Sequence, residues 1–387
     1  MICKTVIAPL PAVVLVVLWW KRGTARPRDD VAPLLPFFGL GIGAGLFTSW
    51  VERHFVGAQG AEFHMSILQR GLIAARDFWF YLFKLFWPAK LTFIYPRWQI
   101  NLDAWSQYVF LLGLALVLLL ALSLALRKQM RGPLATALIF LGLLFPALGF
   151  INVFPFVYSF IADHFQYLAC AAPLTLFAVG VTIGLDSLAP AKTFLRSAIY
   201  GALLLTVGVL SWRQCRDYRD IETLWRTTIA RNPDCWMAHN NLGNRLCDVG
   251  QIDEGILHLR EAVRLQPHDG VYHYNLATAL AGQRNFSEAF VEFRDALSVM
   301  PDSAEIRNNF AIALAQAGKT DEAIEEFRTA LRIKPDYVKG HYNLGYLLLH
   351  LHRKNEALLE FKKVVDLKPD FADAKKRVEA LEASKTE

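Results

Sequence analysis

Cysteine is scarce in this chain of 387 residues, which holds five. Their number is odd, no two of them form a C-x-x-C pair, and Cys170 lies inside an apolar run. This pattern implies neither a disulfide framework nor a zinc site. Neither a metal nor a firmly bound cofactor is expected from it.

Acidic side chains are also sparse in the first 212 residues, where 8 Asp and Glu stand against 16 Lys and Arg, a net charge of +8. The remaining residues hold 27 acidic and 25 basic side chains, a net charge of −2, and the two parts sum to the +6 of the whole chain. Basic residues that flank apolar runs are typical of membrane proteins. The basic excess therefore does not indicate a nucleic-acid-binding surface, and no nucleic-acid partner is expected.

Long apolar runs fill this first part. A spanning helix needs about 20 residues to cross a hydrocarbon core of about 30 Å. The candidates are roughly residues 5–20, which is short, 31–51, 104–126, 134–153, 167–185 and 194–212. Amphipathic rings favour the headgroup region, and several tryptophans stand at segment ends: Trp19, Trp20, Trp50, Trp105 and Trp212. We predict a membrane domain over residues 1–212 with about six spans and membrane lipid as a partner.

A further segment, residues 64–87, carries Arg70, Arg76, Asp77 and Lys84. Such charges are costly in lipid unless they face a cavity or the segment lies at the interface. Two interpretations remain, a re-entrant or interfacial segment and a plain spanning helix.

Loop charge favours the re-entrant interpretation. The first loop holds Lys21, Arg22, Arg26 and Arg28, and the loop after residue 126 holds Arg127, Lys128 and Arg131. Basic loops are cytoplasmic, and both are so only if residues 52–103 enter and leave on one side. Continued alternation puts Asp163 outside, Lys192 and Arg196 inside, and everything after Trp212 in the periplasm or the lumen of a secretory organelle.

Five prolines in the second part of the chain stand 34 residues apart without an insertion. They are Pro233, Pro267, Pro301, Pro335 and Pro369. This is the period of the tetratricopeptide repeat, a helical hairpin. Small residues fill the eighth and twentieth places, and bulky ones the twenty-fourth. These columns are Gly243, Ala277, Ala311 and Gly345; Gly255, Ala289, Ala323 and Ala357; Leu259, Phe293, Phe327 and Phe361.

The repeats complete an all-α prediction for the chain. Four repeats cover residues 236–369, a connecting amphipathic helix over 213–235 continues from the last span, and a polar capping helix covers 370–387. One column departs from the repeat motif, because basic residues replace its early tryptophan. They are His239, His273, Arg307 and His341.

One amide recurs in every repeat, two places before the small residue of the first helix. The four are Asn241, Asn275, Asn309 and Asn343. First helices line the concave face of such a solenoid, and an amide offers a donor and an acceptor to a peptide backbone whatever its side chains. We expect either contact with polypeptide in this groove or a position at which asparagine is merely tolerated.

Asp163 and His164 stand side by side between two predicted spans. A carboxylate and an imidazole at a membrane boundary suit a phosphate, a metal or a sugar hydroxyl. The alternative, which spacing alone favours, is that the charge only marks the end of a helix at the interface.

Several stretches together resemble the later membrane portion of the transmembrane and tetratricopeptide-repeat-containing O-mannosyltransferase family. They are Lys4-Thr5-Val6, Leu18-Trp19-Trp20-Lys21-Arg22-Gly23, Phe93-Ile94-Tyr95-Pro96-Arg97-Trp98, Asn152-Val153-Phe154-Pro155-Phe156 and Ala162-Asp163-His164-Phe165-Gln166-Tyr167-Leu168. The resemblance implies a type C glycosyltransferase fold. It also implies transfer of mannose from a polyprenyl or dolichyl phosphate carrier to Ser or Thr of proteins, with the repeats on the catalytic side.

The resemblance also implies candidate contacts for the lipid phosphate or its pocket, namely Arg70, Arg76, Arg97, Asp163 and His164. A guanidinium suits phosphate, and a snorkelling or structural role is the alternative for each. In this family an acidic pair that activates the acceptor lies in a loop before everything seen here, so we expect it to be missing. The chain is then a fragment or binds without catalysis. An inactive membrane-tethered interaction scaffold is the alternative function.

Overall fold

The computed structural model describes residues 8–58, 60, 63–127, 130–188 and 193–386. Within these ranges the regular structure is helical, as the sequence predicts, and no strand occurs. The chain divides into two compact units, Met1–Pro233 and Asp234–Glu387. Lys4, Lys128 and Lys192, which enter the resemblance and the loop-charge argument, lie outside the described residues.

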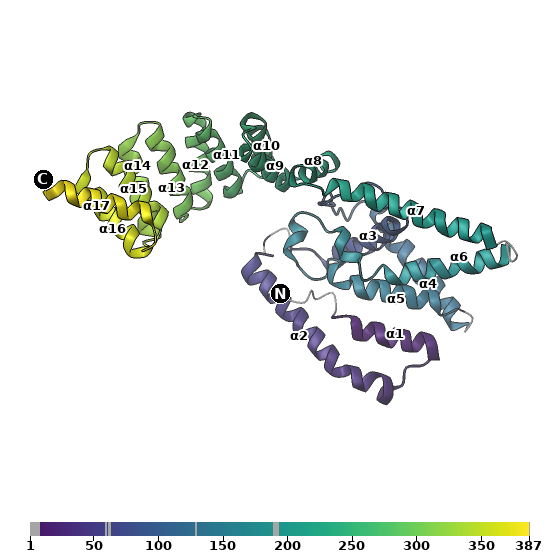
Figure 1. Cartoon of the computed structure of the whole chain (residues 1–387). Coiled ribbons are helices and arrows are strands. Elements are labelled where there is room, and N and C mark those ends of the chain that lie inside the picture. Colours follow the sequence, from purple (N-terminus) through teal and green to yellow (C-terminus); the bar gives the residue numbers. More distant parts are fainter. Residues whose placement is uncertain (1–7, 59, 61–62, 128–129, 189–192, 387) are drawn as a thin grey trace. The chain divides into compact units, whose positions relative to one another are not determined.

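The first unit, called the membrane unit below, is built from eight α-helices in the described residues (Figure 1). They are α1 (Leu10–Arg22), α2 (Leu35–Val51), α3 (Ile67–Phe86), α4 (Tyr108–Leu126), α5 (Gly132–Leu144), α6 (Ala171–Leu188), α7 (Thr193–Asp217) and α8 (Ile221–Arg231). Short 3₁₀ and π turns join several of them, including the 3₁₀ turns Phe154–Val157 and Asp163–Gln166.

Three helical segments are long and apolar enough to cross a membrane, Pro27–Val56, Trp105–Leu126 and Thr193–Asp217. Two shorter apolar segments accompany them, Gly132–Ala147 and Ala171–Ser187. α5 ends at Leu144, well before the end of the predicted span 134–153. Pro146 cannot continue the helical hydrogen-bond ladder, and Gly149 adopts a left-handed φ of 82°. The number of spans and the side of the repeats stay predictions.

Residues 64–87 contain the helix α3. A capping box starts it, in which Ser66 Oγ accepts from the Gln69 N–H at 3.2 Å and Gln69 Oε1 accepts from the Ser66 N–H at 2.8 Å. Its apolar face is buried in the core of the unit against α5, with Phe78 beside Phe140. By contrast, α2 buries none of its residues. α3 is therefore part of the core of this unit, and its Arg70 and Lys84 donate to backbone carbonyls of neighbouring loops.

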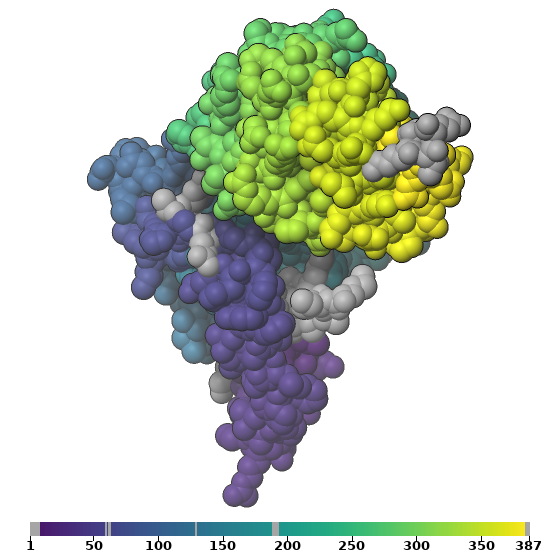
Figure 2. All heavy atoms as spheres, turned by 90° about the vertical axis from the view of Figure 1, so that its left-hand side faces the viewer, coloured from purple at the N-terminus to yellow at the C-terminus, as the bar shows by residue number. Residues whose placement is uncertain are grey.

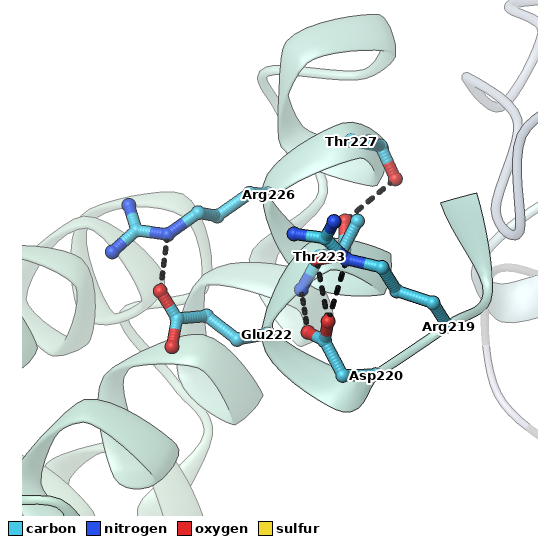
Figure 3. A network of polar contacts seen from close by, with 6 residues as sticks. All are labelled: Arg219, Asp220, Glu222, Thr223, Arg226 and Thr227. Carbon is cyan, nitrogen blue, oxygen red and sulfur yellow. Dashed lines mark hydrogen bonds and ion pairs between the residues drawn. The ribbon is translucent and has the colours of Figure 1, made fainter. Parts of the chain in front are cut away.

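The connection into the repeats is two helices, not the single helix predicted over 213–235 (Figure 3). α7 runs on to Asp217, and α8 starts after Asp220, which has an extended backbone. Asp220 caps α8 by accepting from the Thr223 N–H at 2.7 Å and the Thr223 hydroxyl at 2.9 Å, and Arg219 donates to the same carboxylate. The cap satisfies the first N–H groups of a new helix, and this favours the break.

The second unit, called the repeat unit below, is a row of helical hairpins (Figure 1). Its helices are α9 (Trp236–Asp248), α10 (Ile252–Leu265), α11 (Gly270–Gly282), α12 (Phe286–Val299), α13 (Ala304–Gln316), α14 (Thr320–Ile333), α15 (Val338–His350), α16 (Lys354–Leu367) and α17 (Ala372–Thr386). Consecutive pairs from α9–α10 to α15–α16 form the four hairpins, here repeats 1 to 4, and α17 packs on α16. Figure 2 looks at the end that carries α17 and shows the yellow atoms of these last helices packed together.

The small and bulky columns form the interior of each hairpin. Leu259, Phe293, Phe327 and Phe361 are at most 1% exposed. In repeat 1 both small places are glycine, and a Cβ on Gly243 would lie 2.8 Å from the carbonyl oxygen of Gly255. The backbones of α9 and α10 therefore approach more closely than side chains would allow.

Candidate functional site

The four amides predicted to face polypeptide lie half-buried on the first helices α9, α11, α13 and α15. Each of the last three donates to the repeat before it. Asn275 donates to Asn240 Oδ1 at 2.8 Å, Asn309 to the Tyr274 hydroxyl at 2.6 Å and Asn343 to Asn308 Oδ1 at 2.9 Å. The amides thus tie neighbouring repeats together.

The residue before each amide completes this row. It alternates between asparagine and tyrosine, as Asn240, Tyr274, Asn308 and Tyr342. Asn308 is 3% exposed, and its Nδ2 donates to Asn309 Oδ1 at 3.0 Å. Sequence analysis missed this column, although its two-repeat alternation beside the amide column was a visible signal.

Each amide of the row keeps hydrogen-bonding capacity. In the described part of the chain, the side-chain oxygens of Asn275 and Asn343 accept no hydrogen bond and Nδ2 of Asn241 donates none. Nδ2 of Asn309 has a second N–H beyond the one that it gives to Tyr274. The row is therefore a line of oriented, half-buried amide groups.

A second row links the prolines to the basic column. His273 Nε2 lies 3.0 Å from the Pro267 carbonyl oxygen and its Nδ1 lies 2.7 Å from Glu292 Oε2. In repeat 4, His341 joins Pro335 and Glu360 in the same way, at 2.9 and 2.6 Å. Each basic side chain thus fastens the turn that precedes its repeat to the second helix of that repeat.

The other two members of the column vary this pattern. The Arg307 guanidinium donates to the Pro301 carbonyl and to Glu326 Oε2, whereas His239 Nδ1 lies 3.0 Å from His258 Nδ1. Burial alone would lower the pKa of His341, but the bonds to Glu360 and the Pro335 carbonyl raise it above its ordinary value against the opposing charge of Lys363. The imidazolium form is therefore favoured at that position.

In the membrane unit, a cavity of about 1150 Å³ lies between α2, α3, α4 and α5. Its lining is mainly apolar, and Arg53, Arg70 and Asn152 are among its polar residues. Arg70 donates to Asn152 Oδ1 at 2.8 Å and to the carbonyl oxygens of Phe63, Met65 and Gly149. The guanidinium thus links the segment before α3 to the segment after α5, beside the cavity.

Asp163 lies in a polar cluster at another place in this unit. The Tyr95 hydroxyl donates to its Oδ1 at 2.8 Å. Burial raises the pKa of Asp163, and the Tyr95 hydrogen bond and the charges of Lys84 and Arg231 oppose that rise. Arg231 also pairs with Asp217 at 2.8 Å. These partners come from α3, α7, α8 and the loop after α3, so sequence spacing gave no signal for them.

Three further candidates have aromatic neighbours. Arg76 stacks on the Trp98 ring, 4.2 Å from its centroid, and Arg97 lies 5.1 Å from the centroid of Phe160. His164 contacts the ring of Phe165 at 4.6 Å, and Asp77 is fully buried. Of the five predicted pocket residues, Arg70 lines the cavity and Asp163 lies in the polar cluster.

Comparisons with known families identify the repeats. Residues 241–304 and 338–371 match tetratricopeptide repeat models, and residues 312–351 match a TPR repeat model. A stretch of 134 residues is 31% identical to the protein O-mannosyl-transferase Tmtc2 of Drosophila melanogaster, covering 33% of this chain and 14% of that protein. The match thus spans a small part of the relative's length.

Solved structures that resemble the chain include tetratricopeptide-repeat proteins and MamA. MamA of Desulfovibrio magneticus is 17% identical with a TM-score of 0.37, covering 41% of this chain and 92% of that chain. A thermophilic TPR protein of Thermus thermophilus is 22% identical with a TM-score of 0.37, covering 46% and 96%. YrrB, described as a TPR protein with an unusual peptide-binding site, is 20% identical with a TM-score of 0.35, covering 50% and 95%.

Proposed function

We propose that this protein is a membrane-anchored tetratricopeptide-repeat receptor that holds an extended polypeptide against its first helices. The observation that carries the proposal is the row of four half-buried amides, one on each first helix. Bonds to the preceding repeat fix the orientation of Asn275, Asn309 and Asn343, so little side-chain entropy is lost when a ligand binds. Their unused oxygens and N–H groups match the alternating donors and acceptors of a peptide backbone.

Photo-crosslinking tests where the polypeptide lies. The full chain in detergent carries benzoylphenylalanine either at Tyr346, exposed on the first helix α15, or at Leu359, exposed on the second helix α16. The probe is a reduced, carboxymethylated and fluorescently labelled protein, which cannot fold. We expect crosslinking from position 346 and little from position 359. Equal crosslinking from both positions would contradict binding along the first helices.

Two variants distinguish direct contact of the four amides with polypeptide from an indirect effect through the stability of the repeats. Alanine at all four amide positions should weaken probe binding about tenfold or more, which corresponds to a loss of about 1.4 kcal/mol. The control replaces Asn240 and Asn308, which support the row from the preceding place. If the control weakens binding as much as the fourfold variant, the amides act through repeat stability and not by contact.

A second function, transfer of mannose from a polyprenyl or dolichyl phosphate to Ser or Thr of the held polypeptide, has separate support. The similarity to Tmtc2 favours it, and the apolar cavity suits the lipid chain with its phosphate near Arg53 and Arg70. We propose that the repeats lie on the periplasmic or luminal side, where such transfer takes place. A reporter after Glu387 that proves cytoplasmic would exclude this arrangement.

The lipid proposal is tested with a photoactivatable polyprenyl phosphate. Gly142 lines the cavity and has open space around it, so Gly142→Trp should fill the cavity and reduce labelling at least fivefold. Gly180→Trp is the matched control, because Gly180 also has open space but does not line the cavity. Equal labelling in both variants would favour a scaffold that the membrane unit only anchors. Incorporation of labelled mannose into protein then tests the transfer itself.

A further inference from the structure

Three ligand-type side chains converge in repeat 2, away from the amide row. His273 of α11 is buried, Glu292 of α12 is half-buried and Asp295 of α12 is exposed, and one potential ligand atom from each lies within 4.8 Å of the others. The site is thus anchored on the interior side and open to solvent at Asp295. It joins the two helices of one hairpin.

The hydrogen bonds of His273 fix which ring nitrogen faces the carboxylates. Nε2 lies 3.0 Å from the Pro267 carbonyl oxygen, which only accepts, so Nε2 carries a proton. Nδ1 lies 2.7 Å from Glu292 Oε2, which only accepts, so Nδ1 carries a second proton in this arrangement, and a metal ion that binds there displaces that proton and takes the Nδ1 lone pair. An imidazole that donates to a backbone carbonyl through one nitrogen and binds an ion through the other is the common arrangement at metal sites.

The other three repeats show what occupies the equivalent space. Repeat 1 has Glu261 in the place of Asp295, and Arg264 holds that carboxylate through two bonds of 2.9 and 2.6 Å. Repeat 3 inserts the Arg307 guanidinium between Pro301 and Glu326, at 2.8 Å from the latter. Repeat 4 has Lys363 in the place of Asp295, and its charge acts on His341. Each of these repeats supplies a permanent cation.

Repeat 2 has none of these three cations. Its residues at the equivalent places are Ser298, His273 and Asp295. In the described part of the chain neither Glu292 nor Asp295 forms an ion pair with Lys or Arg, and Glu292 pairs only with the imidazole. Two carboxylates and one imidazole therefore share a site whose counterparts are all neutralised by a basic side chain.

We propose that a divalent transition-metal ion of the Zn²⁺ type binds repeat 2 through His273 Nδ1, Glu292 and Asp295. Imidazole and carboxylate are both zinc ligands, with bonds of about 2.0–2.2 Å, so tetrahedral ligand atoms lie about 3.4 Å apart. The ion binds after Nδ1 and Oε2 separate by about 0.7 Å and Asp295 turns inward, and water completes the coordination. The bound ion clamps α11 to α12.

Zinc content of the full chain in detergent tests the site with Zn²⁺ alone as the probe. After chelation, exposure to micromolar Zn²⁺ and dialysis, metal per chain is measured by mass spectrometry. Asp295→Lys copies repeat 4 and should lose one equivalent relative to the wild type. Lys363→Asp gives repeat 4 the same three side chains as repeat 2 and should gain one. Both positions are exposed, and circular dichroism checks that the helices persist.

Hydrogen exchange supplies a second readout, which also reports on the clamp. At a free Zn²⁺ concentration about 100 times the dissociation constant, global opening of repeat 2 should slow about 100-fold in the wild type and remain unchanged in Asp295→Lys. Unchanged zinc content in either variant, or exchange in repeat 2 that Zn²⁺ does not slow, overturns the inference. Neither result bears on the proposed polypeptide binding, which rests on the amide row and not on His273, Glu292 or Asp295.

Discussion

Replacing Gly243 by alanine should destabilise repeat 1, although alanine is the better helix former. Helix propensity favours the substitution by about 1 kcal/mol, and repeats 2 and 3 have alanine at this place. The new Cβ, however, would lie 2.8 Å from the Gly255 carbonyl oxygen and 2.7 Å from Leu259 Cγ. The carbonyl belongs to helix backbone and cannot turn away, so α9 and α10 must move apart by about half an ångström. Overpacking of this kind costs about 1–3 kcal/mol.

The expected net loss for Gly243→Ala is therefore about 1 kcal/mol, or roughly fivefold faster opening. Hydrogen exchange of amides in α9 and α10, measured by mass spectrometry on the full chain, reports it locally. Gly282→Ala is the matched control, because Gly282 closes α11 and a Cβ there meets no atom within 4 Å. The control should leave exchange unchanged or slow it. Slower exchange in Gly243→Ala would refute the argument that close backbone approach requires glycine in repeat 1.

Three further outcomes follow from single contacts. The pKa of His341 is raised in the folded state, so the stabilisation that its charged form gives is present at low pH. It is lost as pH rises from about 6.5 through the folded pKa, by at most about 1.4 kcal/mol per pH unit. In urea unfolding, Glu360→Gln should flatten this pH dependence of stability, whereas Lys363→Gln should extend it to higher pH. Asn308→Ala should cost about 1–3 kcal/mol, because it removes a buried amide and leaves its half-buried partners Asn309 and Asn343 unpaired, and urea midpoints measure it. Phe327→Ala should cost about 3–5 kcal/mol in the same assay, since the side chain is 1% exposed.

The repeat unit was predictable because its packing is local. The columns of Gly243 and Leu259 recur every 34 residues, and each pair meets within one hairpin. A 34-residue period in the sequence therefore predicts the same period in the packing contacts. The zinc site was missed for a related reason. His273 and Glu292 stand 19 residues apart, a spacing that matches neither one helix face nor a cysteine motif, and it gains meaning only once the hairpin brings α11 beside α12.

The membrane unit was less predictable because its polar contacts are remote in sequence. Arg70 meets Gly149 and Asn152, which are 79 and 82 residues away, and Arg231 acts on Asp163 from beyond the last apolar helix. A charged side chain in an apolar segment indicates that partners exist but does not say which they are. The charge of Arg70 therefore made it a candidate contact for phosphate, but no sequence pattern indicated the three backbone carbonyls and one amide that orient its guanidinium beside the cavity.

The missing tryptophan of the repeat motif now has a physical explanation. In repeats 2, 3 and 4 the basic side chain that replaces it bonds the proline carbonyl before the first helix and a carboxylate on the second helix, 19 residues further on. A tryptophan at this place would hold the proline turn and the second helix together by burial of its ring alone. A basic side chain holds them by charge-assisted hydrogen bonds, which depend on direction and, where histidine supplies them, on proton or metal-ion concentration. The hairpins that carry histidine at this place thus gain a link that depends on proton or metal-ion concentration, while the packing between their two helices is kept.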